Sequence, residues 1–148
     1  GLGSPHWCMD LHVEISGVTR KTTKAEIIKS AIESIGLQVR DVLNLMEKEA
    51  GLHFKDIRTD GGVSNSNFLM QFQSNILQKT ISRSKNKEVT VLGATYMAGL
   101  YFDLWDFDYL KKLAEYEKFT PKISRENANV VYAKWQKYVN SKLNKKQT

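Results

Sequence analysis

Residues 54–77 of the chain read FKDIRTDGGVSNSNFLMQFQSNIL, and this stretch decides the fold. Residues 54–59 form a short run typical of a buried strand. Asp60-Gly61-Gly62 then interrupts the strand, and Ser64 or Asn65 is placed to cap a helix. The apolar residues that follow recur at helical spacing and would share one helix face: Phe68, Leu69, Phe72, Ile76 and Leu77. A strand, a glycine turn and a helix in this order indicate an α/β layer structure.

The glycine turn is the one local motif that suggests binding. Glycine lets a backbone approach a ligand closely, and a helix N-terminus offers unpaired N–H groups with a partial positive charge. Such a turn suits a phosphate or the ribose edge of a nucleotide. The alternative is purely structural, because glycine turns also occur in α/β proteins that bind nothing there. Asp60 is a candidate general base or magnesium ligand. The favoured interpretation is structural: its carboxylate accepts hydrogen bonds from the backbone N–H groups of its own turn.

Upstream of this stretch lies the clearest helix start in the sequence. Thr23 and Glu26 fit a capping box, in which each side chain accepts from the other residue's backbone N–H. Apolar residues at three- and four-residue steps predict about 26 helical residues, closed by Gly51. Gly36 within this run costs about 1 kcal/mol relative to alanine, so we expect close packing there. Before the helix, the alternation over residues 13–19 predicts a strand.

Downstream, the pattern alternates again between short extended and helical segments. We expect a strand over residues 80–82, a polar loop over 83–87 and a helix that carries Val89, Leu92, Tyr96 and Leu100 on one side. Two further helices are predicted, over residues 109–117 and 126–143. The predicted fold class is therefore α/β, with helices flanking a sheet of about three strands. Such a sheet is too narrow to be complete, which indicates a missing partner segment.

Composition and charge narrow the function classes. The 148 residues are 41% hydrophobic and 26% charged, as in an ordinary globular domain. The net charge is +6, but the basic residues cluster only after Glu126, at Lys134, Lys137, Lys142, Lys145 and Lys146. We interpret them as a solvated face and a basic tail, and we expect no nucleic-acid partner. The most apolar run, residues 89–102, is shorter than the ~18–20 residues of a membrane span.

The residues offer no catalytic centre and no metal site of their own. Cys8 is a lone cysteine, which excludes an internal disulfide and favours a reducing compartment. The three histidines lack metal-ligand spacing, so a zinc site is not expected. Asp103, Asp106 and Asp108 lack the glycine and glutamate of a calcium loop, and we expect turn and cap roles for them.

Several stretches, read in order, resemble the FGGY family of carbohydrate kinases, and within it the glycerol kinases. Asp60-Gly61-Gly62 followed by residues 68–73 is the most specific match, and residues 91–100 (VLGATYMAGL) are another. The remaining similar stretches are residues 1–7, 15–20, 22–28 and 132–135. The resemblance thus covers nearly the whole chain.

The resemblance implies an actin-like, ribonuclease H-like ATPase fold, of which this chain would be part of the second, nucleotide-side domain. Residues 1–120 would form the C-terminal part of that domain, and residues 121–148 its last helix and basic tail. It implies transfer of the γ-phosphoryl group of magnesium-ATP to glycerol, with the catalytic base and glycerol site upstream of this chain. The N-terminal domain of the same kinase would be its partner, in a cytoplasmic enzyme that forms homo-oligomers.

The resemblance also assigns nucleotide-binding residues. The family's contacts fall on Gly62 and Ser66, and the neighbouring Gly61 and Asn67 are predicted to bind the nucleotide with them. The family usually has asparagine where this chain has Ser66, so a flanking asparagine, Asn65 or Asn67, is an alternative contact. Two other functions stay open: a kinase of another sugar such as xylulose, and a non-catalytic interaction module that uses the basic tail.

Overall fold

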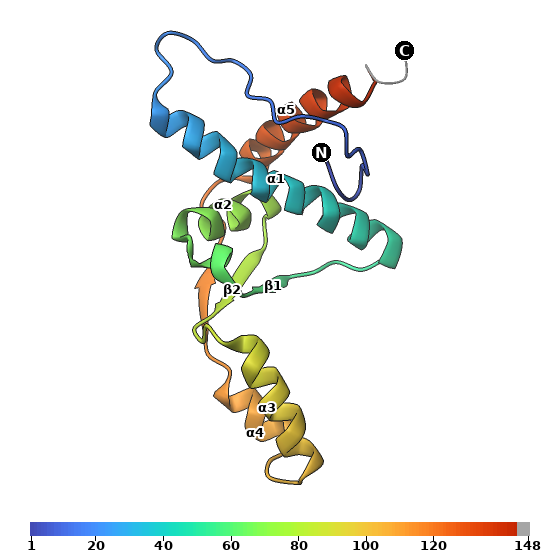
Figure 1. The fold of residues 1–148 in the computed structure, drawn as a ribbon, viewed down its shortest axis with the longest axis vertical. Helices are drawn as coiled ribbons and strands as arrows, with labels where there is room; N and C mark the ends of the chain where they lie inside the picture. The colour runs from blue at the N-terminus through green and yellow to red at the C-terminus, as the bar shows by residue number, and fades with distance from the viewer. Residues whose placement is uncertain (145–148) are drawn as a thin grey trace.

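The computed structural model describes residues 1–144, which fold into a small α/β layer with a helical arm (Figure 1). Lys145 and Lys146 of the basic tail lie outside the described residues. The elements are α1 (Lys24–Ala50), β1 (Asp56–Thr59), the 3₁₀ helix η1 (Gly62–Asn65), α2 (Asn67–Leu77), β2 (Thr80–Ser84), α3 (Val89–Tyr101), α4 (Phe107–Leu113), β3 (Tyr116–Phe119) and α5 (Arg125–Asn144).

The sheet has the order β1-β2-β3, with β2 in the centre. β1 and β2 are parallel, with Ile57 opposite Ile81, and η1 and α2 form the crossover between them. β3 runs antiparallel to β2 and places Phe119 opposite Ile81. The expected fold class, an α/β structure with a narrow sheet and flanking helices, is confirmed. Two parallel strands also bring their carboxyl ends to one edge of the sheet.

α1 begins and ends where its sequence signals predict. The Thr23 backbone N–H donates to Glu26 Oε2 at 2.8 Å, and the Glu26 N–H donates to Thr23 Oγ1 at 3.3 Å. Gly51 ends the helix with a φ of 63°, a left-handed conformation that glycine adopts without strain. At Gly36 an added Cβ would stand 2.7 Å from the ring of Phe72, so the expected close packing of α1 on α2 is confirmed.

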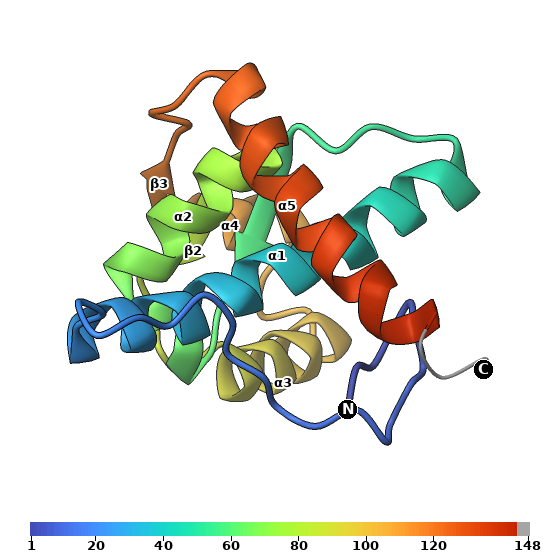
Figure 2. The same ribbon diagram turned by 90° about the horizontal axis from the view of Figure 1, so that it is seen from above.

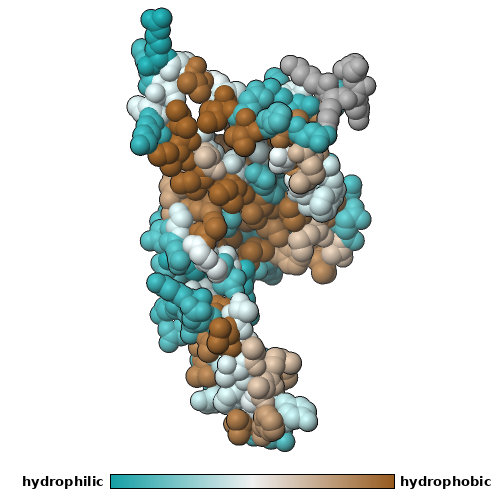
Figure 3. All heavy atoms as spheres, in the orientation of Figure 1, coloured by the Kyte–Doolittle hydropathy of each residue, from teal (hydrophilic) through white to brown (hydrophobic). Residues whose placement is uncertain are grey.

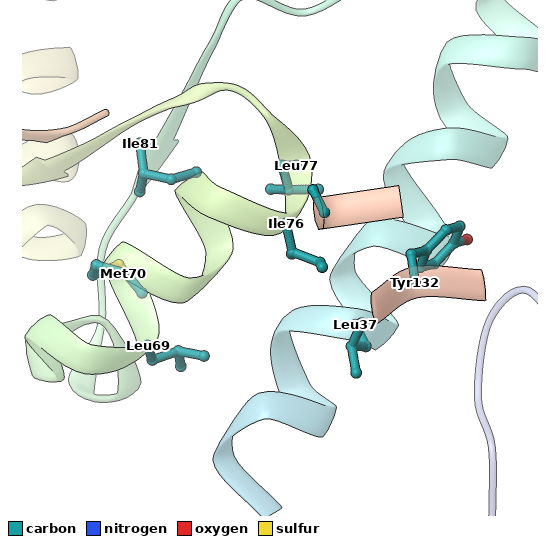
Figure 4. Close-up of a cluster of buried hydrophobic side chains, with 8 residues drawn as sticks. Leu37, Leu69, Met70, Ile76, Leu77, Ile81 and Tyr132 are labelled. Carbon is teal, nitrogen blue, oxygen red and sulfur yellow. The ribbon is translucent and has the colours of Figure 1, made fainter. Parts of the chain in front are cut away.

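The core lies around α2, between α1 and α5 on one side and the sheet on the other (Figure 4). Seen from above, α5 lies beside α2 and crosses α1 (Figure 2). Asp41 of α1 fixes this crossing, since it accepts from the Tyr132 hydroxyl at 2.5 Å and from Trp135 Nε1 at 2.7 Å. Burial, followed by the hydrogen bond to Asp41, raises the pKa of Tyr132 to about 12.

Three sequence-based expectations are wrong in detail. Residues 13–19 form no strand, because Val13 and Val18 are exposed and no described strand lies beside them. The helix expected over residues 109–117 spans Phe107–Leu113 instead, and Tyr116–Phe119 pairs with β2 as β3. The cap of α2 is Ser66 rather than Ser64 or Asn65, because η1 takes up residues 62–65.

α3 and α4 form an arm, residues 89–113, that extends away from the sheet (Figure 1). Trp105, which lies between the two helices, packs on α3, and its Nε1 donates to Tyr96 O at 3.1 Å. Many large apolar side chains of the arm are exposed, and Figure 3 shows hydrophobic atoms on its surface. They are Val91, Met97, Tyr101, Phe102, Leu104, Phe107, Tyr109 and Leu113. Within residues 1–144, no helix combines the length and apolarity needed to cross a membrane.

Candidate functional site

A pocket of about 210 Å³ opens at the carboxyl ends of β1 and β2. In open α/β sheets, ligands bind in the crevice outside the carboxyl ends of the strands. The turn after β1, the end of β2 and the loop after β2 line the pocket together. Its lining residues are Asp60, Gly61, Gly62, Ser64, Asn65, Ser84, Asn86 and Lys87.

The two glycines of the turn have different structural roles. Gly61 has φ 84° and ψ 172°, a conformation that is essentially restricted to glycine. Its carbonyl accepts from the Ser64 hydroxyl at 2.7 Å and from the Ser64 N–H at 3.1 Å, which fixes the turn. Gly62 opens η1, where an added Cβ would meet nothing within 4 Å. Because the first N–H groups of a helix have no acceptor within it, the bare Gly62 backbone can donate to a ligand.

Arg83, at the end of β2, holds the turn against the sheet. Its Nη1 donates to Ser64 O at 2.7 Å, and its Nη2 donates to Asn67 Oδ1 at 2.8 Å. The same Nη2 forms an ion pair with Glu117 of β3 at 2.5 Å. Arg83 therefore joins η1, the first turn of α2 and β3. Sequence reasoning placed it only in a polar loop, and no local pattern indicates this role.

The four residues predicted to bind a nucleotide occupy two different settings. Gly61 and Gly62 line the pocket. Ser66 caps α2, where its Oγ accepts from the Leu69 N–H at 3.2 Å, and the Asn67 side chain is held by Arg83. Neither is among the lining residues, whereas Asn65 is. Ligand contacts from all four stay predictions, with Asn65 the better-placed asparagine.

Sequence reasoning did not assign the part of the lining that comes from the end of β2 and the loop after it. Ser84 ends β2, Asn86 and Lys87 follow it, and all three line the pocket. Asn86 is oriented by its own loop, since its Oδ1 accepts from the Glu88 N–H at 2.9 Å. The rule that parallel strands end at the same edge would have found these residues, had the pairing of β1 with β2 been foreseen.

The acidic residues singled out from the sequence occupy separate places in the structure. Residues 1–144 hold no group of three or more potential metal ligands among His, Cys, Asp and Glu. Asp106 caps α4 by accepting from the Tyr109 N–H at 2.7 Å, and Asp108 pairs with Lys111 at 2.9 Å. Asp60 lines the pocket beside Gly61, and a general-base or magnesium role for it stays untested.

Known proteins are similar to this chain over nearly its whole length. Glycerol kinases of Bacillus cytotoxicus and Listeria monocytogenes are 41% and 43% identical to it over 141 residues. Each alignment covers 94% of this chain but 28% of the relative, so the chain spans little more than a quarter of these proteins.

Solved structures match the fold. The crystal structure of Plasmodium falciparum glycerol kinase with ADP has a TM-score of 0.87 and 32% identity, over 95% of this chain and 29% of that one. A ligand-bound xylulose kinase from Lactobacillus acidophilus has a TM-score of 0.74 at 21% identity, over 96% of this chain and 30% of its own, and shares the fold.

The sequence also matches the model of a protein family. Residues 1–101, which include the glycine turn and the whole of α3, match the C-terminal domain of one group of kinases. The chain therefore belongs to the FGGY family of carbohydrate kinases.

Proposed function

We propose that this chain is the nucleotide-side part of a longer kinase that transfers the γ-phosphoryl group of ATP to glycerol. The observation that carries the proposal is the pocket at the carboxyl ends of β1 and β2, where the Gly61-Gly62 backbone is bare. The relatives that span 94% of the chain are glycerol kinases, and the similar Plasmodium falciparum enzyme was crystallised with ADP.

The pocket suits the adenosine side of the nucleotide better than its phosphates. The Gly62 N–H can donate to a ring nitrogen or a ribose oxygen, and the Asn65 amide can both donate and accept. Lys87 and Asp60 both line the pocket, so its lining carries one positive and one negative side chain. A carboxylate next to the glycine turn would accept from ribose hydroxyls but repel a phosphate.

Magnesium would enter with ATP, bound mainly through the phosphates. Mg²⁺ in phosphoryl-transfer sites is held by one or two carboxylates together with substrate phosphates, and it neutralises the developing charge. Asp60 is the acid in the pocket lining, and we propose that any other protein ligands of the ion come from the rest of the polypeptide. The catalytic base and the glycerol site belong there too.

The missing part of the polypeptide would also complete the fold. The exposed apolar residues of the α3–α4 arm form a surface that would be buried in a larger protein. We propose that the upstream part of the kinase, including its N-terminal domain, covers this surface and widens the sheet. The division at residue 120, the cytoplasmic location and the homo-oligomer stay predictions that follow from the family resemblance.

The test is kinase activity of the longer polypeptide and of residues 1–148 alone. With ATP and magnesium, the longer protein should release ADP with glycerol and far less with xylulose. The chain alone should release none, because phosphoryl transfer depends on positioning both reactants. A preference for xylulose would favour another sugar kinase. Glycerol-dependent turnover by the chain alone would contradict the division of roles.

A further inference from the structure

A second, larger pocket of about 650 Å³ lies at the amino ends of the same two strands. Lys55 precedes β1 and Thr80 begins β2, whereas the glycine-turn pocket starts at Asp60. A strand rises about 3.3 Å per residue, so the two pockets are separated by about 15 Å along β1. The lining residues are Arg40, Asn44, Glu47, His53, Phe54, Lys55, Leu77, Gln78, Lys79, Thr80, Pro121, Arg125 and Asn129.

The pocket has one carboxylate, and that carboxylate is already neutralised. Glu47 Oε1 accepts from Lys79 Nζ at 2.7 Å and from the Phe54 N–H at 2.8 Å. Lys79 Nζ also donates to Phe54 O at 2.8 Å. Both side chains of this ion pair are mostly buried, with exposed fractions of 14% and 15%. The ion pair therefore holds this part of the pocket lining in place. Among the described residues, no other acid lines the pocket to pair with its remaining cations.

Three cations remain without a counter-charge in the pocket. Arg40 donates to Ala128 O at 3.2 Å and to Asn129 Oδ1 at 2.7 Å, and both acceptors are neutral. Its guanidinium also lies 4.0 Å from the centre of the Tyr132 ring, which holds it in place. Lys55 and Arg125 have no carboxylate within ion-pair distance among residues 1–144. The cations come from α1, the loop before β1, and α5.

We propose that this pocket binds a small anion with more than one negative charge, of the phosphate or phosphate-ester class. Arginine's planar fork matches phosphate oxygens, and lysine adds a point charge. Neutral donors and acceptors on Asn44, Gln78 and Thr80 are available for the rest of such a ligand. The site is distinct from the glycine-turn pocket and does not depend on the function proposed for that pocket. A charged metabolite bound in this pocket would lie at the amino ends of β1 and β2, at the opposite end of these strands from the glycine-turn pocket.

The test is calorimetric titration of the full chain with sodium pyrophosphate at fixed ionic strength, with sodium chloride as the blank. We expect saturable binding of one pyrophosphate per chain. The double variant Lys55→Gln/Arg125→Gln should weaken it by about tenfold or more, because even one charge-assisted hydrogen bond contributes about tenfold to affinity. Far-UV circular dichroism of each variant checks that the helices are intact.

Two controls separate this site from its alternatives. Lys134→Gln/Lys137→Gln removes the same charge from positions of α5 outside the pocket lining and should leave affinity within about twofold, because salt screens charges that do not contact the ligand. Gly62→Val should also leave it unchanged. The proposal is overturned if the wild-type chain shows no saturable heat. It is also overturned if the α5 variant loses as much affinity, or if Gly62→Val alone abolishes binding.

Discussion

The two ends of the β1–β2 pair are built in opposite ways. At the amino ends, Lys79 and Glu47 form a mostly buried ion pair that ties β2 and α1 to the loop before β1. At the carboxyl ends, the two glycines of the turn carry no side chain, and Arg83 holds the turn through Ser64 O. An ion pair between side chains fastens the amino ends, whereas the backbone conformation of the glycines shapes the carboxyl ends and Arg83 supports it.

This difference shows where stability and function separate. Changes in the ion pair should alter the free energy of unfolding, because they leave a charge in a partly buried place. Changes that fill the glycine-turn pocket should alter ligand binding and leave the fold intact. The predictions below test this separation, from the largest expected effect to the smallest.

Loss of Lys79 should have the largest effect on stability. Lys79→Met keeps the aliphatic length but leaves Glu47 without its cation, at an expected cost of about 2–3 kcal/mol. Urea unfolding followed by circular dichroism measures the change. Adding Glu47→Gln to this variant should recover part of the loss, since no charge is then stranded. A cost below about 0.5 kcal/mol would place this pair with ordinary surface ion pairs.

Gly61→Ala should destabilise the chain through conformation alone. An added Cβ at Gly61 would meet nothing within 4 Å, so no clash contributes. The cost of holding a non-glycine residue at φ 84° is about 1–3 kcal/mol. Gly62→Ala is the matched control, because Gly62 has no positive φ and the same open space. Equal unfolding free energies for the two alanine variants would show that the turn does not require Gly61.

Ser66→Ala should cost about 1 kcal/mol, the usual price of losing a helix N-cap. The Ser66 hydroxyl accepts from the Leu69 N–H, and alanine removes that acceptor. Ser66→Asn should keep the stability, because asparagine caps helices as well as serine does. If thermal unfolding shows the asparagine variant to be as unstable as the alanine one, the capping role is wrong.

The smallest expected effect is on the stability of the fold at acidic pH. The hydrogen bond from Lys79 is the largest cause that lowers the pKa of Glu47 from 4.5. A carboxylate with a lowered folded pKa contributes stability above its unfolded pKa and loses it as the pH falls through the folded value. Stability should thus decline below about pH 4.5, and less steeply in Glu47→Gln. The midpoint of urea unfolding, measured from pH 6 to pH 3, reports this loss of stability. If the midpoint falls equally steeply with pH in the wild-type chain and in Glu47→Gln, the assignment is contradicted.

Sequence reasoning succeeded where the signal is local. The Thr23–Glu26 capping box and Gly51 gave the bounds of α1, and the glycine turn was placed correctly after β1. It failed where structure depends on distant partners. β3 forms because Tyr116–Phe119 pairs with β2 although its sequence does not alternate, whereas residues 13–19 alternate but have no described strand beside them.

The candidate site follows the same division. Gly61 and Gly62 were found from the sequence because glycines at a strand end have a local meaning. Arg83 and Lys87 were not assigned, because their roles appear only once β2 is placed beside β1. Ser66 was predicted as a ligand contact, and the structure gives its hydroxyl a role as a cap.

The most direct test is Gly62→Val in the intact kinase, with the KM for ATP, the KM for glycerol and the Tm measured on the same preparation. Because Gly62 lines the pocket and an added Cβ there would meet nothing within 4 Å, we predict that valine intrudes on the ligand and that the KM for ATP rises by about tenfold or more. The KM for glycerol and the Tm should stay close to those of the wild-type enzyme. An unchanged KM for ATP together with a lowered Tm would show that Gly62 serves only the turn, and the nucleotide assignment would fail.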